Sequence, residues 1–318
     1  MEKLPFEEIE RKIIVKSKAA GRLGIKPQQR AVKEILNYGI VNIDKPAGPT
    51  SHNVAAFVQK ILEIGKTGHS GTLDPAVTGC LPVALGRATR VTEALLSAGK
   101  EYVCVMHVHQ DLTEEQIKEG LKNFVGKIRQ TPPKKSAVKR EERERHVYYI
   151  IVLEIKGRDV LFKIGCEAGT YIRMICHDFG QFIKAGAHMK ELRRTKAGPF
   201  NEETLCTLYE LKDAYILWKE KGDERLLRKY ILPVEKAVEH LPKVWILDKA
   251  VKPVSHGRDP YANQIAKLED GIREKDRVAV LTLKGELLAL GNSYLDSESL
   301  MKKDSVPAIK IDKVFSNQ

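Results

Sequence analysis

The sequence lacks any uninterrupted apolar run of the roughly 20 residues that a membrane-spanning helix requires. Its first residues, MEKLPFEEIERKIIVKSK, mix acidic and basic side chains and contain no apolar stretch like that of a secretory signal. We therefore expect no membrane attachment and a cytoplasmic location. The 318 residues are enough for a sizeable core and favour two domains over one.

Cysteine is scarce, with five residues in the chain, and no pair has the C-x-x-C spacing of a zinc or redox site. Most lie in apolar segments, which is typical of small buried side chains in a reducing compartment. The five are Cys80, Cys104, Cys166, Cys176 and Cys206. His107 and His109 would share one face of a strand, but no third ligand is near them in sequence, so a metal site is not favoured.

Acidic residues are also fewer than basic ones. Lysine and arginine number 54, aspartate and glutamate 42, and the net charge is +12. Such a surplus attracts polyanions over long distances, which favours a nucleic-acid partner. The alternative is a solvated basic surface that serves only solubility.

Hydrophobic spacing predicts a chain of alternating strands and helices. YGIVNIDKPAGPTS reads as a strand and a turn, after which Thr50 or Ser51 caps a helix. CLPVAL and EYVCVMHV resemble strands. TEEQIKEGLKNFVG reads as a helix with a capping box between Thr113 and Gln116.

The second half of the chain continues this alternation and then changes character. HVYYIIVLEI and RDVLFKIGC predict a hairpin around Lys156-Gly157, and a helix should open at Thr170. Residues 205 to 240 follow a charged helical pattern. After Pro242 the runs are short and β-rich, with a turn at Lys284-Gly285, which indicates a small all-β barrel.

The stretch GHSGTLDPAVTG, Gly68 to Gly79, holds a single acidic residue, Asp74. Its glycines allow sharp turns and close approach of a ligand. A carboxylate that acts as nucleophile or base needs a fixed position and a neighbouring cation, for which Arg173 is the main candidate, with Arg87 and Arg90 as rivals. The alternative is that Asp-Pro in this loop only forms a turn.

The glycine-rich stretch resembles the signature of the TruB-type pseudouridine synthases. KPAGPTSH, KEYVC, QTPPKKSAVK and GTYIRMICHDFG are similar to other motifs of that family, in its order and at its spacing. GAHMKELRRTKAGPF is similar to the archaeal and eukaryotic branch, the dyskerin type, and the C-terminal β-rich unit resembles a PUA domain. The resemblance covers about residues 36 to 315.

The resemblance implies an α+β fold. It consists of a mixed, largely antiparallel bent sheet flanked by helices, followed by a small all-β PUA pseudo-barrel. It also implies three segments: an N-terminal extension over residues 1–35 that packs on the PUA domain, a TruB-like catalytic domain over 36–241, and the PUA domain over 242–318.

The implied reaction breaks the glycosidic bond of a uridine in RNA, turns the uracil and rejoins it through carbon, with no cofactor and no metal. Asp74 matches the catalytic aspartate, which acts on the ribose. Attack at the anomeric carbon and removal of the 2′ proton both stay open. Arg173 matches the arginine that pairs with this aspartate, and an adjacent cation favours a charged carboxylate.

The resemblance also supplies a substrate pocket. Tyr102 matches the tyrosine that stacks on the flipped base, and Leu192 matches an apolar wall beside it. His69 matches a histidine near the displaced nucleotides, while Lys45 and Pro46 would shape the pocket floor. Without the motifs, Tyr102 and Leu192 read as ordinary core residues.

Two basic groups are predicted to bind RNA. The first, in the position of the loop that grips substrate RNA in the family, consists of Lys139, Arg140, Arg143 and Arg145. The second, near the pocket, consists of Arg193, Arg194 and Lys196. These side chains could hold phosphates, although one arginine could be structural, and the first group could be a solvated charged loop.

The dyskerin-type resemblance implies an RNA-guided enzyme, the catalytic subunit of a box H/ACA particle. Its partners would be the guide RNA, a substrate rRNA with tRNA as a further possibility, and three small proteins. A guide-independent tRNA synthase and a non-catalytic RNA scaffold are the alternatives. The chain departs from the family at HGRDPYANQI, which puts the contacts with the ACA end in doubt, and at Gln110. It also lacks a lysine-rich tail, which favours an archaeal form.

Overall fold

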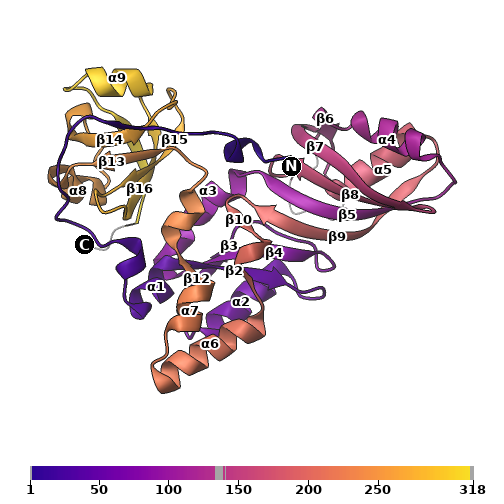
Figure 1. The fold of residues 1–318 in the computed structure, drawn as a ribbon, viewed down its shortest axis with the longest axis horizontal. Coiled ribbons are helices and arrows are strands. Elements are labelled where there is room, and N and C mark those ends of the chain that lie inside the picture. Colours follow the sequence, from indigo (N-terminus) through magenta and orange to yellow (C-terminus); the bar gives the residue numbers. More distant parts are fainter. Residues whose placement is uncertain (1, 133–138, 140, 316–318) are drawn as a thin grey trace.

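The computed structural model describes residues 2–132, 139 and 141–315. Within these ranges the strands form one sheet of eleven and one of six, with helices packed against both (Figure 1). The predicted α+β class is confirmed. No helix in the same ranges is long and apolar enough to cross a membrane.

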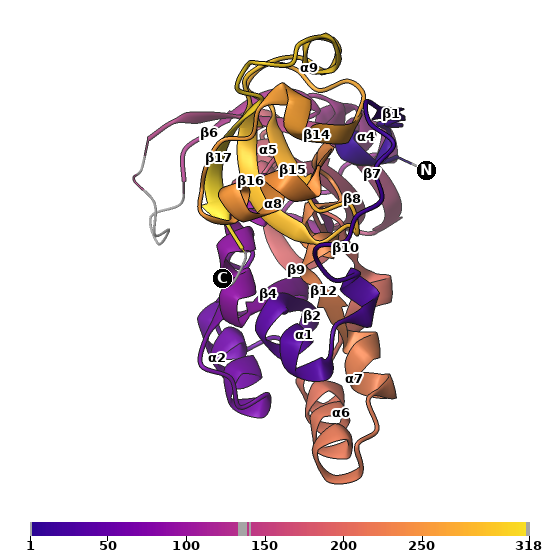
Figure 2. The same cartoon turned by 90° about the vertical axis from the view of Figure 1, so that its left-hand side faces the viewer.

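The helices surround the larger sheet and border the smaller one (Figures 1 and 2). They are α1 Val32–Tyr38, α2 Ser51–Ile61, α3 Thr92–Ser97, α4 Glu114–Lys122, α5 Ile172–Phe182, α6 Leu208–Lys221, α7 Arg225–Tyr230, α8 Asp248–Ser255 and α9 Ser297–Lys302. The smaller sheet contains β1 Ile13–Val15, β13 Lys243–Ile246, β14 Ile265–Glu269, β15 Arg277–Leu281, β16 Leu287–Ser293 and β17 Ile309–Val314.

The larger sheet carries the candidate site. Its strands are β2 Gly39–Lys45, β3 Thr67–His69, β4 Thr78–Leu85, β5 Lys100–Val108, β6 Gly126–Gln130, β7 Arg143–Lys156, β8 Asp159–Cys166, β9 Ala187–Ala197, β10 Phe200–Asn201, β11 Leu205–Cys206 and β12 Ile231–Pro233. The main order is β11-β2-β4-β9-β5-β8-β7-β6, while β12 pairs with β2, β3 with β4 and β10 with β9.

A short parallel contact joins the two halves of the larger sheet. Only Thr78 with Arg193 and Gly79 with Arg194 pair between β4 and β9. Gly79 has φ +98°, and a Cβ at that position would lie 2.2 Å from the Arg194 carbonyl oxygen. Glycine is therefore required where the two strands meet.

Each half of the sheet has its own core. On one side, α1, α2, α6 and α7 pack around β2 and β4, with Val41, Val58 and Leu211 fully buried. On the other, α4 and α5 cover β5, β7 and β8 around Phe162 and Phe179. The amphipathic spacing of these segments places their apolar faces against the sheet.

Several local signals acted as predicted. Thr50 caps α2 by accepting a hydrogen bond from the backbone N–H of Asn53. Thr113 and Gln116 form the expected capping box of α4. β7 and β8 form a hairpin whose turn contains Gly157 at φ +59°.

Two local predictions were wrong. Tyr171, not Thr170, is the N-cap of α5, because the Thr170 hydroxyl donates to the Glu167 carbonyl. The helical pattern over 205 to 240 is also interrupted: Ile231–Pro233 is a strand whose Ile231 lies opposite Val41 of β2. Sheet pairing there overrides the helical spacing.

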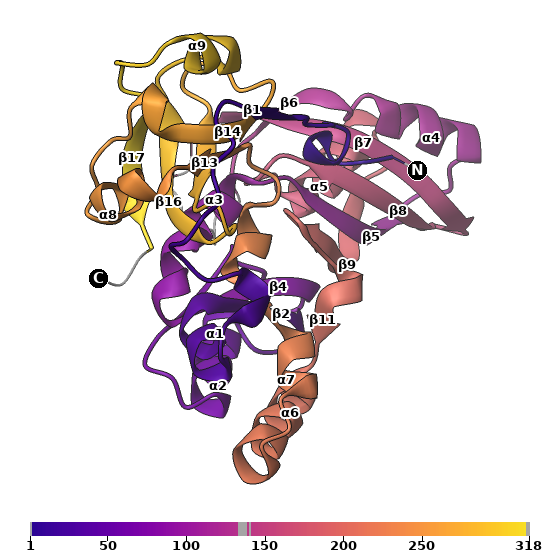
Figure 3. The ribbon, with the colours of Figure 1, turned by 60° about the vertical axis from the view of Figure 1, so that its left-hand side comes forward.

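The N-terminal segment contacts both units. β1 extends the smaller sheet, with Ile13 opposite Glu269 of β14 (Figure 3). Further toward the N-terminus, Leu4 is fully buried and Glu7 accepts two hydrogen bonds from Lys196 of β9, at 2.8 and 3.0 Å. The segment therefore lies along the C-terminal unit and also ends against the sheet that carries the site.

A buried polar cluster joins the larger sheet to the C-terminal unit. The Arg30 guanidinium, 1% exposed, donates to both oxygens of Glu235 at 2.7 Å. Arg30 and Arg87 lie over the Tyr38 ring, 4.7 and 4.1 Å from its centroid. The Tyr38 hydroxyl donates to the Leu287 carbonyl at 2.6 Å.

We predict that Arg30→Met lowers the free energy of unfolding by about 3 kcal/mol, because it leaves the Glu235 carboxylate without its buried partner. Urea unfolding measures the loss. Arg225→Met is the matched control, since that guanidinium is 89% exposed beside Asp223, and it should cause no measurable change. Equal losses in both variants would show that the Arg30 pair contributes no more than a surface pair.

Candidate active site beside the sheet junction

The glycine-rich loop is both a turn and a means of presenting Asp74. The backbone N–H of Val77 donates to the Asp74 carbonyl at 3.0 Å, which closes a turn with Pro75 at its second position. Proline suits that position because its φ is already fixed. The two interpretations of this residue are thus compatible, since the turn leaves the Asp74 side chain half exposed.

A buried lysine lies beneath this loop. The Lys45 ammonium donates to the carbonyls of Pro46, Pro75 and Val77 at 2.9, 2.9 and 2.8 Å. Burial lowers the pKa of Lys45, while the Asp74 carboxylate opposes that shift. Lys45 and the exposed Pro46 do not themselves line the cavity described below, but Lys45 binds the carbonyl of Val77, which does.

A serine at the start of α2 fixes the residue before Asp74. The Ser51 hydroxyl accepts from the Leu73 N–H at 2.8 Å and donates to the Leu73 carbonyl at 3.2 Å. Together with Lys45, it holds the backbone on both sides of Asp74. The carboxylate therefore projects from a loop with little freedom to move.

Arg173 is the cation that meets Asp74. Its Nη2 lies 2.8 Å from Asp74 Oδ2, and the two side chains are 45% and 50% exposed. The rivals lie elsewhere: Arg87 covers Tyr38, and Arg90 donates to the Val314 carbonyl at 2.6 Å. Ion pairs this exposed contribute about 0.2–1 kcal/mol, so this pair orients the two side chains but is too weak to fix the elements that carry them.

Asp74 and Arg173 open onto a cavity of about 480 Å³. Tyr102 from β5 and Leu192 from β9 line it, so four residues from distant motifs meet in one space. The other lining residues are Gly71, Thr72, Leu73, Val77, Leu96, Lys100, Gly169, Thr170, Tyr171, Ile172, Met189 and Arg194. An aromatic ring, apolar walls and a carboxylate together suit a planar base joined to a sugar.

Lys100 is a cavity residue that sequence reasoning did not place there, and Arg194, expected near the pocket as a phosphate ligand, lines the cavity itself. Arg194 lies opposite Tyr102 in the β5–β9 ladder, and Lys100 precedes Tyr102 by two residues on the same strand face. Burial raises the pKa of Tyr102, with Arg194 opposing, which keeps the phenol protonated at neutral pH. Strand alternation alone could have drawn attention to Lys100.

Lys100 holds the chain between α3 and β5. Its ammonium donates to the carbonyls of Leu95, Leu96 and Ala98, at 2.8, 2.9 and 2.6 Å. Burial lowers the pKa of Lys100 to about 7, and the nearby Arg194 acts in the same direction. Because Leu96 also lines the cavity, Lys100 fixes one of its walls.

His69 lies on β3, two residues before the lining residue Gly71, but does not itself line the cavity. Burial lowers the pKa of its imidazole, and the nearby Arg194 and His52 lower it further. Its buried Nδ1 has no hydrogen-bond partner among the described residues. The lowered pKa favours the neutral form of the His69 imidazole.

The second predicted RNA-binding group is largely engaged in contacts within the protein, so its binding of phosphates stays a prediction. Arg194 is 1% exposed and donates from Nε to the Cys80 carbonyl at 2.8 Å, so it cannot reach phosphates at the surface. Lys196 pairs with Glu7, as described above. Arg193, which is 35% exposed, pairs with Asp44 at 2.9 Å and with Glu202 at 2.7 Å, and these carboxylates raise its pKa.

The first predicted group lies around the start of β7. Lys139 is exposed and pairs with Glu141. Arg143 and Arg145 line a hollow of about 70 Å³ that shares Gly169 and Tyr171 with the main cavity. Arg140 lies outside the described residues. Among the described residues of this group, Arg143 and Arg145 therefore lie beside the cavity.

The described residues, 2–132, 139 and 141–315, contain no group of three His, Cys, Asp or Glu side chains placed to hold a metal ion. His107 and His109 share a strand face, as expected, with ring centroids 6.2 Å apart. His107 Nδ1 lies 2.6 Å from Asp159 Oδ1, and His109 Nε2 lies 2.8 Å from His188 Nδ1.

Comparison with known families assigns the chain to a class of enzyme. The description "TruB family pseudouridylate synthase (N terminal domain)" matches residues 59–113 and 107–172, and "tRNA pseudouridylate synthase B C-terminal domain" matches 173–239. A DKCLD domain matches 2–55 and a PUA domain 242–315. The chain belongs to the TruB family of pseudouridylate synthases, as its motifs indicated.

Close relatives and solved structures agree with this assignment. A "Probable tRNA pseudouridine synthase B" of Pyrococcus furiosus is 53% identical over 312 residues, covering 97% of this chain and 92% of that protein. A chain in a crystal structure of a Cbf5-Nop10-Gar1 complex is 53% identical with a TM-score of 0.94, over 98% of this chain and 96% of that one.

A second solved structure is an H/ACA RNP bound to a substrate RNA containing 2′-deoxyuridine. One of its chains matches with a TM-score of 0.93 and 50% identity, over 99% of this chain and 98% of that one. The likeness extends through both units of the molecule.

We predict that Lys45→Met lowers the rate of pseudouridine formation by about 100-fold. The change leaves three backbone carbonyls without their donor and displaces the Asp74 loop, and a shift of about 1 Å at a reacting group can cost that much. Single-turnover assays measure the rate. The exposed Lys60 of α2 supplies the control, Lys60→Met, and equal rates for both variants would exclude a role for Lys45 in holding the loop.

Proposed function

We propose that this enzyme is an RNA-guided pseudouridine synthase that modifies uridines in rRNA as the catalytic subunit of a box H/ACA ribonucleoprotein. The observation that carries the proposal is the meeting of Asp74, Arg173, Tyr102 and Leu192 at one cavity. A structural neighbour supports the guided form, because it is a chain of an H/ACA RNP bound to a substrate RNA.

In the proposed reaction, a uridine is flipped from the RNA into the cavity. Tyr102 stacks on the uracil while Leu192 forms the apolar wall beside it. Asp74 then acts on the ribose, either by attack at the anomeric carbon or by removal of the 2′ proton. Arg173 keeps the carboxylate oriented toward the sugar, and no cofactor takes part.

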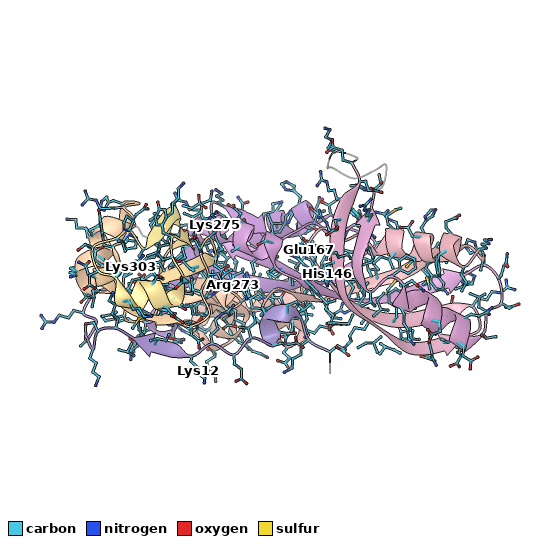
Figure 4. All side chains as sticks on the ribbon, turned by 90° about the horizontal axis from the view of Figure 1, so that it is seen from above. Lys12, His146, Glu167, Arg273, Lys275 and Lys303 are labelled. Carbon is cyan, nitrogen blue, oxygen red and sulfur yellow. The ribbon has the colours of Figure 1, made fainter. Side chains whose placement is uncertain are left out.

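Basic residues on one face of the molecule support binding of RNA. Figure 4 shows Arg273, Lys275 and Lys303 on the C-terminal unit, with His146 of β7 and Glu167 on the same face. The three cationic side chains, Arg273, Lys275 and Lys303, are exposed. Phosphate contacts of such residues fix the position of RNA without reading its sequence. We propose that the guide RNA lies on the C-terminal unit and the substrate at the cavity.

The proposed partners are a guide RNA, a substrate rRNA and three small proteins of the particle. The likeness to a chain in a Cbf5-Nop10-Gar1 complex, with a TM-score of 0.94, supports binding of two such small proteins. A second function, modification of tRNA without a guide, is favoured by the name of the relatives, "Probable tRNA pseudouridine synthase B".

We predict that the chain forms pseudouridine in an rRNA target only when a matching guide RNA and the partner proteins are present. The target would be labelled at one uridine, and product would be counted after nuclease digestion. A guide with two mismatches to the target is the control and should abolish turnover, since pairing places the uridine. Turnover on bare tRNA, indifferent to the guide, would instead assign the guide-independent function.

We predict that Asp74→Asn abolishes detectable turnover and changes RNA affinity by less than about threefold, because affinity depends on phosphate contacts elsewhere. Rate and binding would be measured on the same assembled complex. Asp213→Asn, at an exposed position of α6, is the control and should retain full activity. Turnover above background in the Asp74 variant would contradict the role proposed for this carboxylate.

A further inference from the structure

Asp74 and Arg173 come from opposite halves of the larger sheet. The Asp74 backbone is fixed by Lys45 and Ser51, on the β2 and β4 side. Arg173 lies in the first turn of α5, which follows β8 in the other half. A half-exposed ion pair is too weak to align two separate elements, so the position of α5 must be fixed by other contacts.

The first turn of α5 has no side-chain cap from its own N-cap residue. Its N-cap, Tyr171, supplies no side-chain hydrogen bond to the helix. The Tyr171 carbonyl begins the helix by accepting from the N–H groups of Met174 and Ile175, at 3.0 and 3.2 Å. The free backbone groups at a helix start need a partner, which can be a side chain, water or a tighter backbone bond.

Gln130, the last residue of β6, supplies that partner from another element. Its Oε1 accepts from the Tyr171 N–H at 3.0 Å, and its Nε2 donates to the Tyr171 carbonyl at 3.1 Å. The side chain is 4% exposed, so water does not replace these bonds easily. Both ends of one amide thus bind the peptide groups of a single residue, 41 positions away in sequence.

We propose that Gln130 is a positioning residue for pseudouridine formation, which sets the first turn of α5 and through it the place of Arg173 opposite Asp74. The inference rests on the pseudouridine synthase reaction of the family and does not require the guided form. Gln130 touches no reacting atom, since it lies outside the main cavity.

The place of Gln130 also gives it a second connection. β6 is the last strand at one edge of the larger sheet (Figure 2). Within it, Gln130 lies opposite Arg143 of β7. Gln130 and Arg143 line the small hollow that shares Tyr171 with the main cavity. A shift of the β6–β7 pair is therefore transmitted to the helix that carries Arg173.

The test is Gln130→Met, which keeps the length of the side chain and removes both hydrogen bonds. We expect kcat to fall by about 10- to 100-fold, as for a misplaced reacting group, while KM changes by less than about threefold. Gln181→Met, at an exposed position in the last turn of the same helix, is the matched control and should behave as the wild type.

A double-variant cycle distinguishes positioning of Arg173 from general damage. In an Arg173→Ala background, Gln130→Met should reduce the single-turnover rate by less than about twofold, because the group it positions is gone. An equal reduction in both backgrounds would overturn the proposal. So would wild-type kcat in the single variant. All variants are assayed on an RNA that the wild-type chain modifies, with or without a guide. A failure of the guided function would therefore not be mistaken for a failure of the role of Gln130.

Two further measurements keep the proposal open to refutation. Hydrogen exchange of the amides from Tyr171 to Arg173 should be faster in Gln130→Met, and unchanged exchange would contradict the proposed contact whatever the activity. If Gln130→Met does not fold, Gln130→Glu replaces it. That variant keeps the acceptor for the Tyr171 N–H and loses the donor, so its kcat should fall less, yet still below that of Gln181→Met.

Discussion

The two-residue contact between β4 and β9 is the constraint on which the site depends. Gly79 lets the two strands approach, and Arg194, its partner at the junction, lies opposite Tyr102 on the next strand. Because the Asp74 loop enters β4 and the Tyr102 strand borders β9, this junction brings loop and ring to one cavity. A side chain at position 79 would force the two halves apart.

Much of the positive charge near the site serves the protein itself. Lys45 and Lys100 donate hydrogen bonds to backbone carbonyls, while Arg193 and Lys196 form ion pairs with carboxylates. These cations fix the walls of the cavity by binding groups that burial would otherwise leave unpaired. The net charge of +12 therefore overstates what this cavity offers to RNA.

Local signals in the sequence were sufficient for much of the fold. Thr50 and Thr113 predicted helix starts because capping depends on neighbours within three residues. Ile231–Pro233 escaped the same reasoning, since its partner is β2, far away in sequence. Thr170 failed as a cap for a related reason: the partner of the α5 start is Gln130, on another strand. Pairings between distant elements leave no local pattern.

For the site, the motifs and their order were enough to predict the family, the carboxylate Asp74 and its partner Arg173. Each of these can be recognised within a single motif. The tertiary structure alone decided which cations are free. Arg194 and Arg193 read alike in sequence, yet one is buried in the cavity wall and the other is neutralised by carboxylates from β2 and the segment after β10. Burial and pairing depend on what the fold places beside a side chain, and neighbours in sequence do not reveal that.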